Sequence, residues 1–157
     1  MNDIPGYFSS HAVVDPNMKV IPKCFVLALK FKKKKQDLNG YTLLHHAITY
    51  NHLEIVQLLL RYSADPNVQD LRRGYSSLHE AVLVQNQQTF NLIVSYSSSN
   101  AKTNVNIKDK DGWTPLHFAC LLENFEMVKQ LLRDHAADIM ATTSEGKKKR
   151  NLLKRRK

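Results

Sequence analysis

The sequence predicts an all-α fold, a solenoid of stacked helix-turn-helix units. One motif occurs three times, and in each copy a glycine precedes a histidine by five residues and an alanine by seven. The copies span residues 37–47, 74–81 and 109–120. Their histidines, His45, His79 and His117, are separated by 34 and 38 residues. This is the period of a repeat architecture rather than the arrangement of a catalytic site.

Each copy of the motif predicts a tight turn that leads into a first helix. In the third copy Gly112 supplies the positive φ that such a turn often needs, Thr114 offers a hydroxyl as N-cap, and Pro115 suits the first helical position. His117 follows Thr114 by three residues, so its imidazole is placed to return a hydrogen bond to the cap. We therefore interpret the repeated histidines as helix-start residues rather than as metal ligands or general bases.

A second helix is predicted after each motif, because apolar residues recur there at helical spacing. These residues are Leu53, Val56, Leu59 and Leu60; Phe90, Ile93 and Val94; and Phe125, Val128, Leu131 and Leu132.

The repeated pattern resembles the ankyrin-repeat family. Ala64-Asp65 and Ala137-Asp138 close two copies as that family does, and Asn67 and Asn106 end the first two. The resemblance implies three repeats, at 37–69, 70–108 and 109–141. It also implies β-turn fingers that project between the helix pairs, a concave recognition face, and binding of other macromolecules without a common chemistry.

The chain departs from this family between the two helices of each repeat, where glycine is usual. Asn51, Gln85 and Glu123 stand there instead. Asparagine is the next best residue for a left-handed conformation. Gln85 and Glu123 leave the tightness of their turns open.

The flanks of the repeats predict two further segments. Residues 1–36 are interpreted as a degenerate N-terminal capping repeat or an extension, and the alternative for 23–35 is an amphipathic helix on a membrane surface with a lysine-rich flank. A fourth motif begins at Thr143–Gly146, but basic residues replace its helix start. Residues 142–157 are therefore interpreted as a basic C-terminal tail.

The net charge of +9 is distributed unevenly. Residues 1–35 carry +5 and residues 147–157 carry +8, whereas residues 36–146 carry −4. No run of 18 apolar residues and no signal peptide pattern is found. These features predict an intracellular protein of the nucleus, the cytoplasm or both, which we expect to be a monomer.

The sequence contains no pattern typical of an enzyme. Cys24 and Cys120 are 96 residues apart, without a Cys-x-x-Cys pair, and Cys120 is expected to be a buried, reduced thiol in a small-residue position. No nucleophile-base arrangement or phosphate-binding glycine loop is found. We therefore expect no catalytic activity, no cofactor and no metal.

The residue after each turn glycine is aromatic, and this position is one of the family's variable recognition positions. The rings of Tyr41, Tyr75 and Trp113 are predicted to form a ladder, either as binding anchors or as packing between repeats. Other candidate partner-binding residues are Arg73 at a finger tip and Tyr50, Leu83 and Leu121 at the ends of first helices. Leu83 and Leu121 mark a partner site if exposed, and core if they turn inward.

The tail carries two basic clusters, and three roles stay open for it. Its basic residues are Lys147, Lys148, Lys149, Arg150, Lys154, Arg155, Arg156 and Lys157. Such runs are read by nuclear-import receptors, bind nucleic acid without sequence specificity, or are solvated ends with no role.

The function predicted from these features is that of a non-enzymatic adaptor or inhibitor, which binds another protein on the fingers and the concave face. The alternative is a nuclear, nucleic-acid-associated protein that uses its basic tail. Residues 70–82, with one extra residue before Gly74, also resemble repeats of inhibitor-of-NF-κB proteins. The chain lacks the acidic phospho-degron and the full repeat number of those proteins.

Overall fold

The computed structural model describes residues 12–13, 21–22, 36–97 and 102–144. Two short strands, β1 (Ala12–Val13) and β2 (Ile21–Pro22), form an antiparallel pair before the repeats. The helix predicted at 23–35 and the basic residues of the tail lie outside the described residues.

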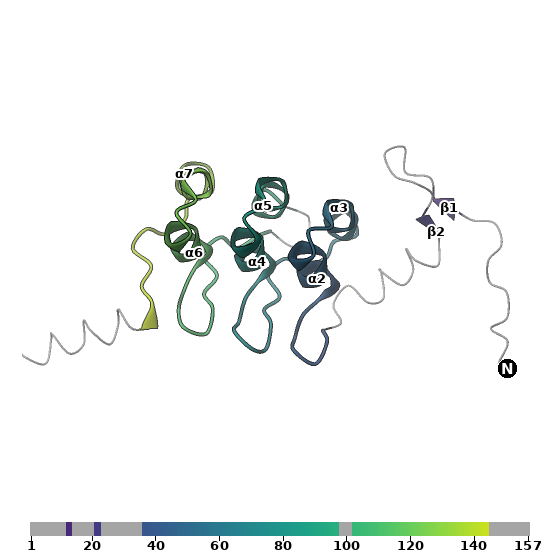
Figure 1. Ribbon diagram of the computed structural model, residues 1–157, viewed down its shortest axis with the longest axis horizontal. Helices are drawn as coiled ribbons and strands as arrows, with labels where there is room; N and C mark the ends of the chain where they lie inside the picture. The colour runs from purple at the N-terminus through teal and green to yellow at the C-terminus, as the bar shows by residue number, and fades with distance from the viewer. Residues whose placement is uncertain (1–11, 14–20, 23–35, 98–101, 145–157) are drawn as a thin grey trace, which may run out of the picture.

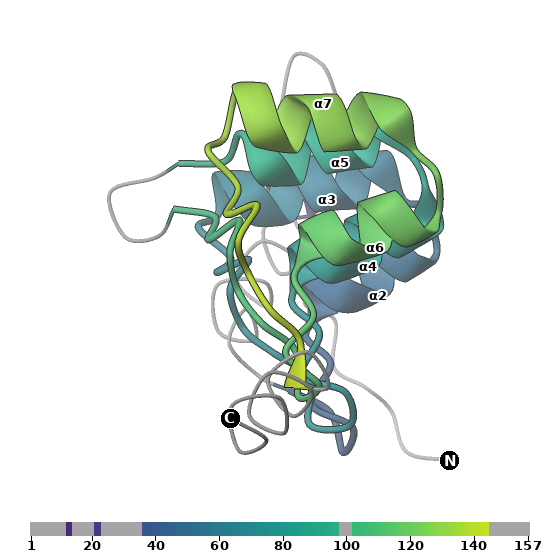
Figure 2. The same cartoon turned by 90° about the vertical axis from the view of Figure 1, so that its left-hand side faces the viewer.

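Three consecutive helix pairs make up the described repeats (Figure 1). They are α2 (Leu43–Thr49) with α3 (Leu53–Arg61), α4 (Ser77–Val84) with α5 (Gln87–Val94), and α6 (Pro115–Leu121) with α7 (Phe125–Arg133). Viewed along the stack, α2, α4 and α6 form one layer, α3, α5 and α7 form a second, and the fingers project away from both (Figure 2). The predicted all-α solenoid of helix-turn-helix units is confirmed.

The first helix of each repeat begins with a capping box, as the motif predicts. Thr114 is the N-cap of α6, Pro115 is its first residue, and the Thr114 backbone N–H donates to Nδ1 of His117 at 3.1 Å. The same box joins Thr42 to His45 and Ser76 to His79. Two orphan N–H groups are thus satisfied at each helix start.

The turns between the two helices of each repeat share one backbone conformation. Asn51, Gln85 and Glu123 have φ of 56°, 57° and 54°. The doubt about Gln85 and Glu123 is thereby resolved, since both residues adopt the left-handed conformation in which asparagine and glycine are favoured.

Each finger is built on an aspartate whose carboxylate accepts backbone N–H groups. Asp70 accepts from Arg72 at 2.7 Å, from Arg73 at 2.8 Å and from Tyr75 at 2.6 Å. Burial raises the pKa of Asp70, but these backbone hydrogen bonds outweigh it and hold that pKa below its usual value. The carboxylate therefore fixes the shape of the finger.

The apolar stripes of the second helices form the core between the two layers. Most of their residues are buried, among them Val56, Leu59, Phe90, Ile93 and Leu131. Phe125 differs from the others, because it is exposed at the first residue of α7. Leu132 is also partly exposed, because no further repeat covers α7 within the described residues.

Candidate protein-binding surface

The aromatic residue after each turn glycine differs between the repeats in its burial and its contacts. Tyr75 is only 9% exposed. Its ring centroid lies 5.4 Å from that of Phe118 and 5.6 Å from that of His79. The prediction of an exposed binding anchor is therefore wrong at Tyr75, because Phe118 of the next repeat fills the space beside the ring. Tyr75 packs the repeats together instead.

Tyr41 and Trp113 are half-buried and contact the adjacent helices. The hydroxyl of Tyr41 donates to Oε1 of Glu80 at 3.3 Å. The Trp113 ring lies 5.3 Å from the ring of Phe118, centroid to centroid. These two residues retain an accessible edge, but the continuous aromatic ladder is interrupted at Tyr75.

Arg73 is exposed on the second finger, as predicted. Its guanidinium Cζ lies 5.6 Å from the centroid of the Tyr75 ring, which is cation–π distance. Arg73 also favours the charged form of nearby Glu80, although burial dominates and raises the pKa of that carboxyl. The guanidinium therefore lies over the aromatic contact that joins two repeats.

Tyr50, another candidate partner-binding residue, is 69% exposed at the end of α2. Its ring stacks with His46 at a centroid distance of 6.5 Å and lies 6.4 Å from the ring of His52. His46 Nε2 in turn lies 3.0 Å from Oδ2 of Asp37. An exposed aromatic group thus covers the end of α2.

Leu83 and Leu121 differ in exposure although they occupy equivalent positions in α4 and α6. Leu121 is 64% exposed, which is the first of the two alternatives left open for it. Leu83 is half-buried and packs against the core, so it lies between the two alternatives left open for it. We call Tyr50, Leu83 and Leu121 the helix-end row, because they lie at the ends of three consecutive helices of one layer.

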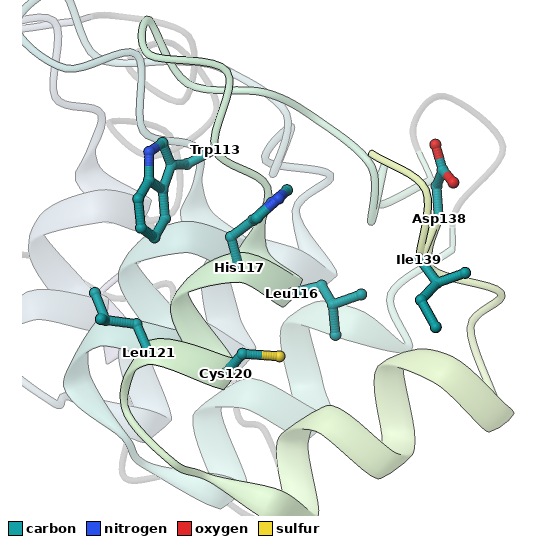
Figure 3. A pocket seen from close by; sticks show the side chains of 7 residues that line it. All are labelled: Trp113, Leu116, His117, Cys120, Leu121, Asp138 and Ile139. Atoms are coloured by element: carbon teal, nitrogen blue, oxygen red, sulfur yellow. The ribbon is translucent and has the colours of Figure 1, made fainter. Parts of the chain in front are cut away.

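A cavity of about 420 Å³ lies beside Leu121 at the end of the stack (Figure 3). It is lined by Trp113, Leu116, His117, Cys120, Leu121, Asp138 and Ile139. Cys120 is exposed here, so the prediction of a buried thiol is wrong. Its small-residue position faces outward from the last described repeat rather than into a core.

The sequence did not single out the residue that follows each repeated histidine. His46, Glu80 and Phe118 occupy this position and make the ring and carboxylate contacts described above. The histidine before this position and the alanine after it are the same in all three copies, whereas the residue itself differs. That difference is the sequence feature from which the position could have been found.

Two of the repeated histidines form hydrogen bonds that connect neighbouring repeats. His45 and His79 are fully buried, and Nε2 of each lies near a backbone carbonyl oxygen of the next repeat, Tyr75 at 3.1 Å and Trp113 at 3.2 Å. Burial lowers the pKa of both imidazoles, that of His79 to about 4. Both are therefore neutral near pH 7, with Nδ1 as acceptor and Nε2 as donor.

The described residues were also searched for metal-ligand clusters and for membrane-spanning helices. Within 36–97 and 102–144, no three residues of the His, Cys, Asp and Glu types come together as a metal site would require. In the same part of the chain, no helix is long and apolar enough to cross a membrane.

Comparison with known proteins decides the family. A family model of ankyrin repeats, in three copies, matches residues 19–108 and 69–143. The chain is an ankyrin-repeat protein. It is similar to human Inversin, with 30% identity over 122 residues that cover 75% of this chain and 12% of that protein. It is also similar to human Ankyrin repeat and SOCS box protein 3, with 43% identity over 103 residues, 66% of this chain and 19% of that protein.

The ankyrin-repeat chain thus spans only about a tenth to a fifth of the length of these relatives. What it shares with them is the repeat array. Ankyrin repeats are a protein-protein interaction module, and this chain is one.

Proposed function

We propose that this ankyrin-repeat protein is a non-enzymatic adaptor or inhibitor, and that it binds its partner along the helix-end row. The observation that carries the proposal is the exposure of Tyr50 and Leu121 at the ends of α2 and α6. Exposed large hydrophobic side chains are typical of a binding site, and aromatic residues dominate the energetics of such sites.

Three neighbouring features support the same surface. The accessible edges of Tyr41 and Trp113 border the row at the base of the fingers, and Arg73 adds a cation on the middle finger. The Tyr50 ring also lies near two imidazoles, with its centroid 6.5 Å from that of His46 and 6.4 Å from that of His52. The surface is therefore largely preformed.

Affinity capture with matched baits tests this proposal. The first bait is the full chain, the second carries Tyr50→Ala with Leu121→Ala, and the third carries Gln57→Ala with Lys129→Ala. Gln57 and Lys129 are exposed on α3 and α7, in the other layer of helices. Circular dichroism verifies that all three are folded.

We expect a partner that the full chain and the Gln57/Lys129 bait capture equally. The Tyr50/Leu121 bait should retain about a tenth of it or less, since each anchor contributes roughly 1–2 kcal/mol or more. Loss of the partner with the Gln57/Lys129 bait, but not with the Tyr50/Leu121 bait, overturns the proposal.

The alternative functions depend on the basic tail. A fourth bait, in which the eight lysines and arginines of 147–157 are replaced by glutamine, distinguishes these alternatives from binding along the helix-end row. A partner that needs these residues and dissociates steeply as salt rises favours an import receptor or nucleic acid. A partner that is indifferent to them supports the helix-end row.

A further inference from the structure

A single carboxylate stands among the three helices of the first layer. Glu80 is the only Asp, Glu, Lys or Arg residue in α2, α4 and α6, and α4 lies between the other two helices (Figure 2). The second layer differs, because α3 and α7 carry exposed charged residues such as Glu54, Glu126 and Lys129. Glu80, by contrast, is only 8% exposed. The first layer therefore holds one nearly buried charge at its centre.

The carboxylate of Glu80 has few partners for its degree of burial. Its Oε1 accepts from the Tyr41 hydroxyl at 3.3 Å, which is long for a hydrogen bond between two oxygens. A carboxylate has about four acceptor positions. Within residues 36–97 and 102–144, no Lys, Arg or His nitrogen lies within 4.0 Å of this carboxylate. The charge of Glu80 is therefore unpaired in the described part of the chain.

Arg73 acts on Glu80 only from a distance. Its guanidinium lies over the Tyr75 ring, with Cζ 5.6 Å from the ring centroid. Burial raises the pKa of Glu80, although the hydroxyl of Tyr41 and the charge of Arg73 oppose the rise. A carboxylate that is buried without an ion pair destabilises the folded chain, and costs of this kind are expected at functional sites.

The stack of repeats does not require a carboxylate at this position. The equivalent residue of the first repeat, His46, has a partner in its own repeat, because its Nε2 lies 3.0 Å from Oδ2 of Asp37. The equivalent residue of the third repeat, Phe118, is apolar and packs against Tyr75, with 5.4 Å between the ring centroids. Glu80 alone combines a charge with burial and the lack of an ion pair.

Glu80 adjoins the helix-end row on two sides. Leu83 follows it by three residues in α4, a spacing that places two side chains on one face of a helix. On the other side Glu80 contacts Tyr41, whose ring centroid lies 5.5 Å from that of His46. His46 in turn stacks with Tyr50. A polypeptide that lies on Tyr50 and Leu83 therefore passes beside the carboxylate.

We propose that Glu80 forms an ion pair with a lysine or arginine side chain of the partner protein, and that it selects a partner with such a residue beside its apolar anchors. This inference rests on the proposed binding along the helix-end row. The partner supplies the cation that Glu80 lacks, and the neighbouring Tyr41 adds an aromatic surface that cations favour. Because Glu80 is already largely desolvated by the fold, its attraction for a cation is stronger than that of an exposed carboxylate.

Random linear peptides displayed on phage are the probe, so the test needs no known partner. Peptides are selected separately on the full chain, on Glu80→Gln and on Glu80→Lys. Glutamine keeps an acceptor for the Tyr41 hydroxyl, so it preserves the local contact. Glu54→Gln, at an exposed position of α3, is the matched control for the loss of one negative charge. Selection at high salt suppresses binding to the basic segments of the chain, and circular dichroism verifies that each variant is folded.

We expect peptides selected on the full chain and on Glu54→Gln to share a lysine or arginine at a fixed interval from their apolar residues. Peptides selected on Glu80→Gln should keep the apolar residues and lose this preference, and those selected on Glu80→Lys should carry an acid there. Replacing the cation of one selected peptide by glutamine should raise its Kd for the full chain about tenfold or more, but not for Glu80→Gln. A cation preference that is absent or that persists on Glu80→Gln overturns the proposal, as does a selection that enriches no peptide.

Tyr50→Ala with Leu121→Ala separates this inference from the proposed function. If a selected peptide depends on Glu80 but binds this double variant with an unchanged Kd, the helix-end row is not the binding surface, while the role of Glu80 stands. If its binding depends on Tyr50 and Leu121 but not on Glu80, the row stands and the inference about Glu80 fails.

Discussion

Nε2 of His79 lies 3.2 Å from the carbonyl oxygen of Trp113, which belongs to the next repeat. Nδ1 of the same imidazole accepts from the backbone N–H of Ser76 at 3.1 Å. One neutral side chain therefore caps its own helix and also joins two repeats. His45 makes the same pair of contacts one repeat earlier, with Thr42 and with Tyr75.

The free energy of unfolding is expected to fall as the pH drops from about 6.5 to 4. Burial lowers the pKa of His79 to about 4, although its hydrogen bond to Trp113 opposes this. An unfolded histidine has a pKa of about 6.5, so it takes up a proton in this window while folded His79 does not. The stabilisation is complete above pH 6.5 and declines by roughly 3 kcal/mol toward pH 4.

Urea unfolding at a series of pH values measures this effect. His79→Gln is the matched variant, because glutamine also serves in a capping box and does not titrate. It should flatten the pH dependence. A stability that is constant or rises between pH 6.5 and 4 in the unsubstituted chain contradicts the role assigned to His79.

Replacing Glu123, in the turn after α6, by glycine is expected to stabilise the protein. Glu123 has a φ of 54°, which costs a residue with a side chain about 1–2 kcal/mol, and glycine avoids this cost. The greater freedom of glycine in the unfolded chain offsets about 0.5–1 kcal/mol of the gain. Glu123→Gly should therefore raise the free energy of unfolding by roughly 0.5–1 kcal/mol.

Denaturant unfolding of Glu123→Gly, with Asn51→Gly as comparison, tests this expectation. The gain should be smaller at Asn51, because asparagine tolerates the left-handed conformation better. Destabilisation by Glu123→Gly shows that the side chain contributes more than its strained backbone costs.

A side chain at Gly40 is expected to destabilise the first two fingers. Gly40 has a φ of 82°, and an added Cβ would lie 2.4 Å from the backbone nitrogen of Leu71. Ala therefore introduces both backbone strain and a clash with the next finger, and Gly40→Ala should cost about 2 kcal/mol or more. Thermal unfolding measures the loss.

The neighbouring Asn39→Ala provides the control for Gly40→Ala. Asn39 is exposed, and its contact with the next finger is made by its backbone carbonyl, which accepts from Leu71 N–H. This substitution should change the stability by less than about 0.5 kcal/mol. Equal effects of the two substitutions contradict the close approach of the fingers at Gly40.

The sequence predicts those parts of the fold that depend on local backbone chemistry. The Gly112 turn, the Thr114 cap and the return bond from His117 are adjacent in the chain, so residue types and spacing suffice. The same holds for the turn at Asn51. Three copies of one motif then define the stack.

Exposure was harder to predict, because it depends on contacts between repeats. Tyr75 and Trp113 occupy equivalent positions, but Tyr75 is buried by Phe118 and Arg73, which no local pattern reveals. Cys120 has the sequence context of a core residue, and its exposure follows from the lack of a described repeat beyond it. Local chemistry therefore suggested a candidate surface, but it did not indicate which of the residues on that surface are exposed.

Site-specific photo-crosslinking tests the central claim, that the helix-end row binds the partner. A photoreactive phenylalanine analogue is placed singly at Tyr50 and at Leu121, and at exposed Gln57 and Lys129 of the other layer as controls. We predict covalent capture of one and the same protein from Tyr50 and Leu121, and none of it from Gln57 or Lys129. Crosslinks to that protein from Gln57 and Lys129 alone would contradict the claim and place the binding surface on α3, α5 and α7.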